Sequence, residues 1–460
     1  MKHVLTIIIL LICSTHSYAT EYTLEDLYKI ALERSEIIKI SAEDLVIAEN
    51  MKDKAMSLLM PRLTAGSSYI RFSDSKLADN RSYLQPLDRT SFELRLDQSA
   101  SLGGKELTGL RIAKEGIEKS QKDLQSVKEE YMLHVTTAYY DTLRTDKLSQ
   151  IAQANVIRVK KYRDAAATRL KVGEITKTVL LRAEAELSGA QSEQIRTDNN
   201  YRLARAILSR MVGIQGEFRL KEGTEELGVL SDKLNEFTIE GCHTMSLDCL
   251  KEKALSERTD LQAAQIQRKI AEDHVDFTKG SYWPTLAFEG VFTKRDETRE
   301  TGGLVKDSAY AGLRLSFPFF EGGLRVAEVQ EASAKKRQAD YAYADLKKTI
   351  EVEVETAYLD HITQRGLLKS LTDQYIFAKE NYNSVSKQFD YGLASSLDVL
   401  DANTALLDSE RQLANVMYLY QFSTLRLKRA TGILLSTILN PTSELPEKRR
   451  MLFNNAKEKS

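Results

Sequence analysis

Proline, cysteine and long apolar runs are all scarce in this chain. Its 460 residues include 6 prolines and 3 cysteines, and the formal net charge is −1. The ranges 87–283 and 319–440 contain no proline, which permits very long helices because proline breaks a helix interior. The near-zero net charge gives no sign of a nucleic-acid partner. After the N-terminal segment, no stretch has about 18 consecutive apolar residues, so we expect no transmembrane helix.

The first 19 residues have the pattern of a secretory signal peptide. Lys2 precedes the apolar stretch 4–12, and the sequence Ser-Tyr-Ala at 17–19 suits cleavage. The apolar stretch is too short to span a membrane. Isoleucine precedes Cys13, where a bacterial lipoprotein site needs a small residue, so lipidation is not expected. The sequence therefore predicts an exported chain with residues 1–19 removed.

The two remaining cysteines, Cys242 and Cys249, lie close together. In an exported protein, cysteines at this spacing are expected to form a disulfide. The alternative is a metal site in which His243 supplies a third ligand. The six histidines do not cluster elsewhere, and we expect no metal or other cofactor.

An internal repeat runs through the chain with an offset of 219 residues. TTAYYD recurs as ETAYLD at this offset, and the correspondence holds without a gap over about 110 residues. Three glycine pairs share it: Gly104 and Gly323, Gly173 and Gly392, Gly213 and Gly432. Upstream, Pro61 and Pro284 correspond at an offset of 223. We therefore expect two structural repeats with one order of elements.

Each repeat is expected to contain a helix, a β-hairpin, a long helix and a final helix. In the first repeat, 20–216, these are placed at 23–60, 61–100, 105–171 and 176–213. In the second repeat, 250–433, they are placed at 250–281, 284–318, 324–390 and 395–432. A linker region, 217–249, and a C-terminal tail, 434–460, complete the chain.

The final helices carry two seams with a spacing of seven residues, which is typical of coiled coils. The first seam in the second repeat is Val399, Leu406, Leu413, Tyr420 and Leu427. The other seam is mostly small: Ala402, Ser409, Val416, Ser423 and Ala430. A helix with two seams favours a tube of helices, and the alternative is a simple four-helix bundle.

The strand-like runs alternate between apolar and polar residues. In the run 91–100, Phe92, Leu94 and Leu96 share one face, opposite charged residues. Runs of about ten residues suit tilted membrane strands. Four strands leave two open edges, which lipid does not tolerate, so partner copies must close the sheet. Two copies give eight strands and three give twelve with room for a pore. The alternative is that the strands cap a soluble coiled coil.

These motifs together resemble the TolC family of trimeric outer-membrane efflux proteins (outer membrane factor). Besides the internal repeat, two segments carry the resemblance: FPFFEGGLRVAEVQEA and YGLASSLDVLDANTALLDSERQLANVMYLY. The resemblance covers about 21–435. It implies an α+β membrane protein with four strands per chain. Three chains would form a twelve-stranded outer-membrane β-barrel, continued by a twelve-helix periplasmic α-barrel of coiled coils.

The resemblance implies a passive exit duct in a tripartite efflux or type I secretion system. Its partners would be two further copies in a homotrimer, a periplasmic adaptor, an inner-membrane transporter and outer-membrane lipid. No nucleophile–base set, metal cluster or phosphate loop appears in the sequence, so we expect no enzyme and no catalytic residue. The alternative is a periplasmic coiled-coil adaptor or scaffold without a membrane barrel.

The resemblance also assigns site residues. Asp398 and Asp401 match acidic residues that ring the closed periplasmic aperture, and their spacing puts both on one helix face. Under threefold symmetry, crowded carboxylates raise one another's pKa and attract cations. The alternative for Asp398 is that it complements the helix dipole. The turns expected to meet the adaptor are Val172, Gly173, Glu174, Ile175 and Thr176, and Tyr391, Gly392, Leu393, Ala394 and Ser395.

Two positions depart from the family pattern. Ala394 stands where well-known members carry an arginine that helps to lock the tip, and Val179 stands where they carry its aspartate partner. That lock is therefore expected to be absent. Lys177 and Glu174 are candidates for a different one.

Overall fold

The computed structural model describes residues 20–79, 81, 83–221, 239, 242, 246–298, 301 and 304–439. The signal peptide and most of the C-terminal tail therefore lie outside the described residues, as do 222–238 and His243. The chain divides into two compact units. The first unit is Met1–Lys39, Ser126–Arg258 and Thr349–Ser460, and the second is Ile40–Gln125 and Thr259–Lys348. Each unit takes segments from both repeats, so the compact units are not the repeats.

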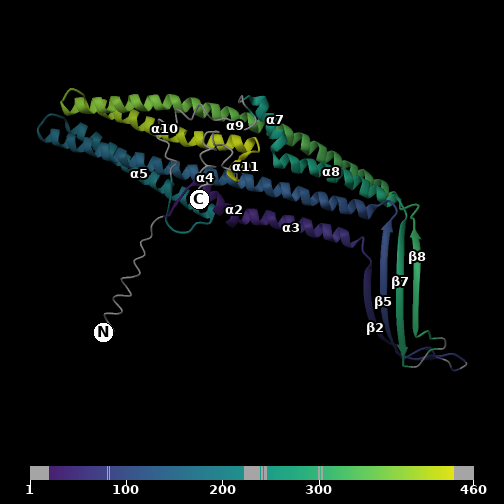
Figure 1. The fold of residues 1–460 in the computed structure, drawn as a ribbon. Helices are drawn as coiled ribbons and strands as arrows, with labels where there is room; N and C mark the ends of the chain where they lie inside the picture. Colours follow the sequence, from purple (N-terminus) through teal and green to yellow (C-terminus); the bar gives the residue numbers. More distant parts are fainter. Residues whose placement is uncertain are drawn as a thin grey trace, which may run out of the picture. The chain divides into compact units, whose positions relative to one another are not determined.

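Each repeat has one very long helix followed by a shorter one (Figure 1). The long helices are α4 (Lys105–Lys171) and α9 (Leu324–Asp390), each of 67 residues. The shorter helices are α5 (Lys177–Val212) and α10 (Ser396–Ala430). The starts of both pairs keep the 219-residue offset of the sequence repeat. The two halves therefore share a backbone layout as well as glycines.

The helical segment that opens each repeat is broken, whereas the sequence suggests one continuous helix. In the first repeat, α2 (Leu24–Arg34) and α3 (Glu36–Ser57) are separated by Ser35. In the second, α7 (Leu247–Glu257) and α8 (Thr259–Lys279) are separated by Arg258. Both separating residues leave the helical conformation, with ψ of 123° and 122°. Ser35 and Arg258 are also buried. Their packing therefore interrupts the helix of each repeat at a position that helix periodicity along the sequence does not reveal.

The second unit contains a four-stranded antiparallel sheet. Its strands are β2 (Arg62–Arg71), β5 (Asp88–Ser101), β7 (Thr285–Glu297) and β8 (Asp307–Ser316), in the order β2-β5-β7-β8. β5 and β7 join the hairpins of the two repeats. The remaining short elements are β1 (Thr20–Tyr22) paired with β6 (Phe218–Leu220), β3 (Lys76–Leu77) paired with β4 (Tyr83–Gln85), η1 (Gly280–Tyr282) and α11 (Leu434–Leu439).

The two faces of the sheet differ in chemistry. One face places apolar residues opposite each other, as with Leu94 and Phe292. Its large side chains are exposed: Leu63, Phe92, Leu94, Leu286, Phe288, Phe292, Leu313 and Leu315. On the other face, Arg95 binds Glu289 at 2.9 Å and Asp97 at 3.0 Å. Within the described residues, no helix is long and apolar enough to cross a membrane. In the single chain, eight large apolar side chains on one face of the sheet are therefore exposed.

Both seven-residue seams of α10 are buried. The large seam, Val399 to Leu427, and the small seam, Ala402 to Ala430, have every member buried. The two series are offset by three residues, so together they form one continuous stripe on one face of α10. Burial of this stripe is expected both in a tube of coiled coils and in a four-helix bundle.

Gly432 ends the second repeat in a left-handed conformation with φ of +77°. A Cβ there would lie 2.9 Å from the backbone nitrogen of Arg258, which cannot move as a side-chain end could. At Gly392, φ is +75° but the space is open. Left-handed strain costs about 1–2 kcal/mol at either site. We therefore expect Gly432→Ala to lower the thermal unfolding midpoint of the detergent-purified protein clearly more than Gly392→Ala. Equal shifts would show that the contact with Arg258 is unimportant.

Candidate functional site

The candidate site is the tip of the first unit, where the two helical hairpins turn. The turn between α4 and α5 contains Gly173 with φ of +81°, and the turn between α9 and α10 contains Gly392. Beneath the turns lies one apolar cluster, which we call the tip core. Its buried members are Tyr162, Ala166, Ala183, Phe389, Val399 and Leu400. Because these residues come from all four helices, the tip core holds the two turns side by side.

The predicted turn residues separate into two groups. Ile175 and Ala394 pack against the tip core and are half-buried. The others are exposed: Val172, Gly173, Glu174, Thr176, Tyr391, Gly392, Leu393 and Ser395. Tyr391 and Leu393 are 82% and 79% exposed, which is unusual for large apolar side chains. The tip therefore presents a small apolar surface at each turn.

Asp398 closes the start of α10. Its carboxylate accepts hydrogen bonds from the Ser395 backbone N–H at 2.8 Å and from the Ser395 hydroxyl at 2.7 Å. Ser395 Oγ in turn accepts from the Asp398 N–H, which completes a capping box. The side-chain and backbone hydrogen bonds from Ser395 lower the pKa of Asp398. In the single chain this carboxylate caps the first turn of α10 and is ionised at neutral pH.

Asp401 lies one turn further along α10 and is exposed. It shares a groove of about 400 Å³ with Asp398. The other lining residues come from α9, the turn and α10: Asn381, Val385, Gln388, Leu393, Ala394 and Ala402. The groove therefore brings the two predicted aspartates together, with no cationic side chain among the residues that line it.

Arg169, which the sequence did not single out, joins the two turns. Its guanidinium donates to the carbonyl oxygens of Phe389, at 2.5 Å, and Asp390, at 3.3 Å, and lies 4.1 Å from the centroid of the Phe389 ring. Its Nε is 3.9 Å from a Glu174 carboxylate oxygen. These carbonyls are at the C-terminal end of α9, where a cation is favoured. Arg169 of the α4–α5 hairpin therefore binds the C-terminal end of α9 in the other hairpin.

A line of polar contacts, which we call the α4–α10 seam, continues from the tip. Arg158 donates to Glu410 at 2.8 Å and to Asn403 at 3.1 Å. Asn403 also donates to Asn155 at 3.0 Å, and Arg144 donates to Asn415 at 3.2 Å. The Arg158 and Glu410 side chains are 18% and 17% exposed, so this ion pair is largely desolvated. The two hairpins of one chain therefore meet through charged and amide groups.

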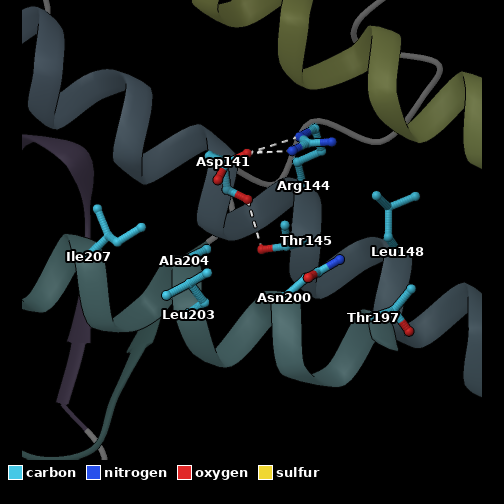
Figure 2. Close-up of a pocket in the computed structure, with 9 residues that line it drawn as sticks. All are labelled: Asp141, Arg144, Thr145, Leu148, Thr197, Asn200, Leu203, Ala204 and Ile207. Atoms are coloured by element: carbon cyan, nitrogen blue, oxygen red, sulfur yellow. Dashed lines mark hydrogen bonds and ion pairs between the residues drawn. The ribbon is translucent and has the colours of Figure 1, made fainter. Parts of the chain in front are cut away.

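A second groove, of about 220 Å³, lies between α4 and α5 (Figure 2). Asp141 and Arg144 of α4 form an ion pair of 2.5 Å beside it, and Leu203 and Ile207 of α5 supply apolar surface. Its nine lining residues include no histidine, cysteine or paired carboxylates. Nothing in this groove suits acid–base or nucleophilic chemistry.

Cys242 and Cys249 are joined by a disulfide, with their Cα atoms 6.0 Å apart. His243, the third ligand of the alternative metal site, lies outside the described residues. Over the part of the chain that the structure describes, no three histidine, cysteine or acidic residues are grouped to hold a metal ion.

The comparisons with known proteins agree with this architecture. A family model described as "Outer membrane efflux protein" matches residues 27–214 and 250–433. The chain is 25% identical to the outer membrane protein TolC of Vibrio cholerae, over 66% of this chain and 68% of that protein. It is 22% identical to TolC of Escherichia coli strain K12, over 94% and 87%.

Among solved structures, the fold is similar to that of the outer membrane protein VceC from Vibrio cholerae. The TM-score is 0.74 at 16% identity, with 89% of this chain and 96% of that chain covered. The family match covers both repeats, from α2 to the end of α10, and therefore includes the sheet and the tip. This chain belongs to the outer membrane efflux protein family.

Proposed function

We propose that three copies of this chain form a passive outer-membrane exit duct for efflux or type I secretion. The observation that carries this proposal is the sheet of the second unit. Its apolar face is bare while its other face carries ion pairs, which is the division expected between lipid and a wet lumen. The family of the chain supports the duct, since its members are outer-membrane efflux proteins.

Closure of the sheet explains why more than one copy is needed. β2 and β8 are the outer strands of the described sheet, and each has a single neighbour in it. In lipid, unpaired backbone groups at such edges cost several kcal/mol each. Pairing β8 of one copy with β2 of the next removes every edge when three copies close a twelve-stranded barrel. The helices then line a periplasmic tube whose end is the tip.

The tip is the part of the duct that we propose to meet a periplasmic adaptor and to close the aperture. The exposed Tyr391, Leu393 and Val172 would bind the adaptor, which connects the duct to an inner-membrane transporter. Asp398 and Asp401 would form two acidic rings at the narrowest point. Ala394 and Val179 stand where other family members carry the arginine and aspartate of the lock. Arg169 would replace that lock, because it binds the end of one hairpin to the other within a chain.

The decisive experiment combines fractionation with assembly and conductance measurements on the mature protein. We expect the protein to stay in the outer-membrane fraction until detergent is added. Native mass spectrometry should give a trimer, and planar bilayers should give discrete ion-conducting channels. Release by a wash without detergent, with no channels, would instead support the periplasmic adaptor or scaffold.

A further inference from the structure

Two acidic side chains are buried where α4 packs against α8 in the second unit. Glu115 of α4 and Asp273 of α8 are 4% and 7% exposed. Lys269 Nζ lies 2.9 Å from Glu115 Oε1, and Arg111 Nε lies 3.0 Å from Asp273 Oδ2. The Lys269 and Arg111 side chains are 64% and 55% exposed. Each buried carboxylate therefore has one cation beside it, and that cation remains largely in water.

Close packing of the two helices explains why the acids are buried. Gly109 of α4 faces Phe277 of α8, and a Cβ at Gly109 would lie 3.3 Å from the Phe277 ring. Lys105 Nζ lies 4.7 Å from the centroid of the same ring and 3.0 Å from Ser281 Oγ. Because Gly109 has no side chain, the helices approach closely beside the ends that lead to β5 and β7. The acids lie a few residues further along the same contact and are covered by it.

The buried carboxylate oxygens are poorly satisfied. Within the described residues, both oxygens of Glu115 and Oδ2 of Asp273 lack a hydrogen bond of good geometry, although the ion pairs are short. A buried charge without hydrogen bonds is costly, and an ion pair with an exposed cation offsets little of that cost. The charge of Glu115 also repels an ionised Asp273. Ionisation of both acids therefore weakens the contact between α4 and α8.

We propose that Asp273 is a proton-binding site, which takes up a proton from mildly acidic solvent and thereby tightens the contact between α4 and α8. The proton removes one of the two buried negative charges and turns the Asp273 carboxyl into a hydrogen-bond donor. Arg111 loses its ion pair at little cost, since its head already lies largely in water. This inference uses contacts within one chain and does not depend on the proposed trimer.

The surrounding charges favour protonation of Asp273. Burial, followed by the charge of Glu115, raises the pKa of Asp273, and Arg111 and Lys269 oppose this rise. The charged groups that act on the two ion pairs come from both helices: Arg111, Glu115 and Glu118 on α4, and Lys269, Asp273 and Asp276 on α8. Acids outnumber cations in this set, which agrees with a raised pKa.

A raised pKa fixes the sign of the pH effect. The folded chain holds the proton at pH values at which the unfolded chain, with an ordinary pKa of 3.8, has released it. The stability that Asp273 contributes is therefore complete below that ordinary pKa and is lost as the pH rises through the raised pKa. An ion-paired carboxylate with a lowered pKa acts in the opposite sense.

The other repeat carries a neutral version of this cluster. The positions that correspond to Arg111, Glu115, Lys269 and Asp273 are all uncharged: Gln330, Ala334, Val46 and Asn50. Asn50 corresponds to Asp273 at the 223-residue offset that relates Pro61 to Pro284. Asparagine has nearly the shape of aspartate and does not titrate. Asp273→Asn is therefore a conservative substitution that the other half of the chain already contains.

The test is the thermal unfolding midpoint of the detergent-purified mature protein as a function of pH. Asp273→Asn is expected to raise the midpoint by roughly 2 °C at about pH 8. This gain should disappear at lower pH, where Asp273 of the parent protein has taken up its proton. The control is Asp340→Asn, since Asp340 of α9 pairs with Arg268 of α8 at 2.8 Å and is 37% exposed. The control should not raise the midpoint at any pH.

Two further measurements separate charge from burial and detect the proton itself. In a Glu115→Gln background, one cause of the raised pKa is gone, so the gain from Asp273→Asn should persist to lower pH. Infrared difference spectra of the parent protein at mildly acidic pH should contain the C=O band of a protonated carboxyl. That band should be missing from Asp273→Asn and should remain in Asp340→Asn.

Two outcomes would overturn the proposal. An Asp273→Asn variant that is no more stable than the parent protein at about pH 8 would show that the ionised carboxylate does not weaken the contact. Identical carboxyl bands in the parent protein and in Asp273→Asn would show that Asp273 does not hold the proton. Neither outcome bears on the proposed duct, which fractionation and conductance test separately.

Discussion

Replacing Asp398 and Asp401 together by asparagine is expected to weaken block of the channel by divalent cations by roughly tenfold. In the proposed trimer, three copies would bring six carboxylates to the tip, and two rings of like charge would attract a divalent cation strongly. The pKa of Asp398 is lowered by its bonds to Ser395, so this charge is present at neutral pH and is lost only under acidic conditions. The same double variant should also raise single-channel conductance. Planar-bilayer recordings with added magnesium measure both effects.

The substitution must preserve the end of α10. Alanine at 398 would remove the hydrogen bonds that the carboxylate accepts from Ser395, whereas asparagine keeps a side-chain oxygen that can accept them. The control is Glu186→Gln, which removes one negative charge per chain, half of what the double variant removes, from an exposed position on α5 away from the groove. Unchanged block in the asparagine double variant would exclude the aspartates from the aperture. Equal weakening in the control would show a general surface-charge effect.

Arg158→Ala is expected to destabilise the folded chain by about 3–5 kcal/mol, because it leaves Glu410 charged, largely buried and without its partner. Asn403 also loses a donor, although its bond to Asn155 remains. The destabilisation should appear as a lower urea midpoint in detergent and as faster proteolysis near the tip.

A double-mutant cycle separates the ion pair from simple loss of packing. Arg158→Met combined with Glu410→Leu should recover most of the lost stability, since an apolar pair of similar volume replaces a buried ion pair without leaving a charge. The exposed ion pair of Lys335 and Glu331 is the control, and Lys335→Ala should cost no more than about 1 kcal/mol. If the double variant is as unstable as Arg158→Ala, an unpaired charge at Glu410 is not the cause.

The family and the duct function could be predicted from sequence because their signals are local and duplicated. Glycines at one offset, alternating strands and two seven-residue seams each follow from the spacing along a single element. The breaks at Ser35 and Arg258 could not be predicted, because both residues continue an acceptable helical pattern and leave it only where packing buries them.

At the tip, too, the sequence alone could not reveal which distant residues come into contact. The sequence placed Asp398 and Asp401 on one face of one helix, and the structure brings them to one groove. It gave no reason to select Arg169 or Arg158, whose partners lie more than 200 positions away along the chain. Likewise, only the fold shows that Ile175 and Ala394 pack inward while their neighbours are exposed.

By itself the sequence determined the doubled architecture, because helix and strand patterns depend on neighbours a few residues apart. Which face of each helix is covered was decided by the tertiary structure alone. The repeats are alike in pattern, yet α4 carries arginines that α10 covers, whereas α9 carries Phe377 and stays bare. Contacts between distant segments depend on side-chain shape and charge across an interface, and no periodicity along one chain encodes them.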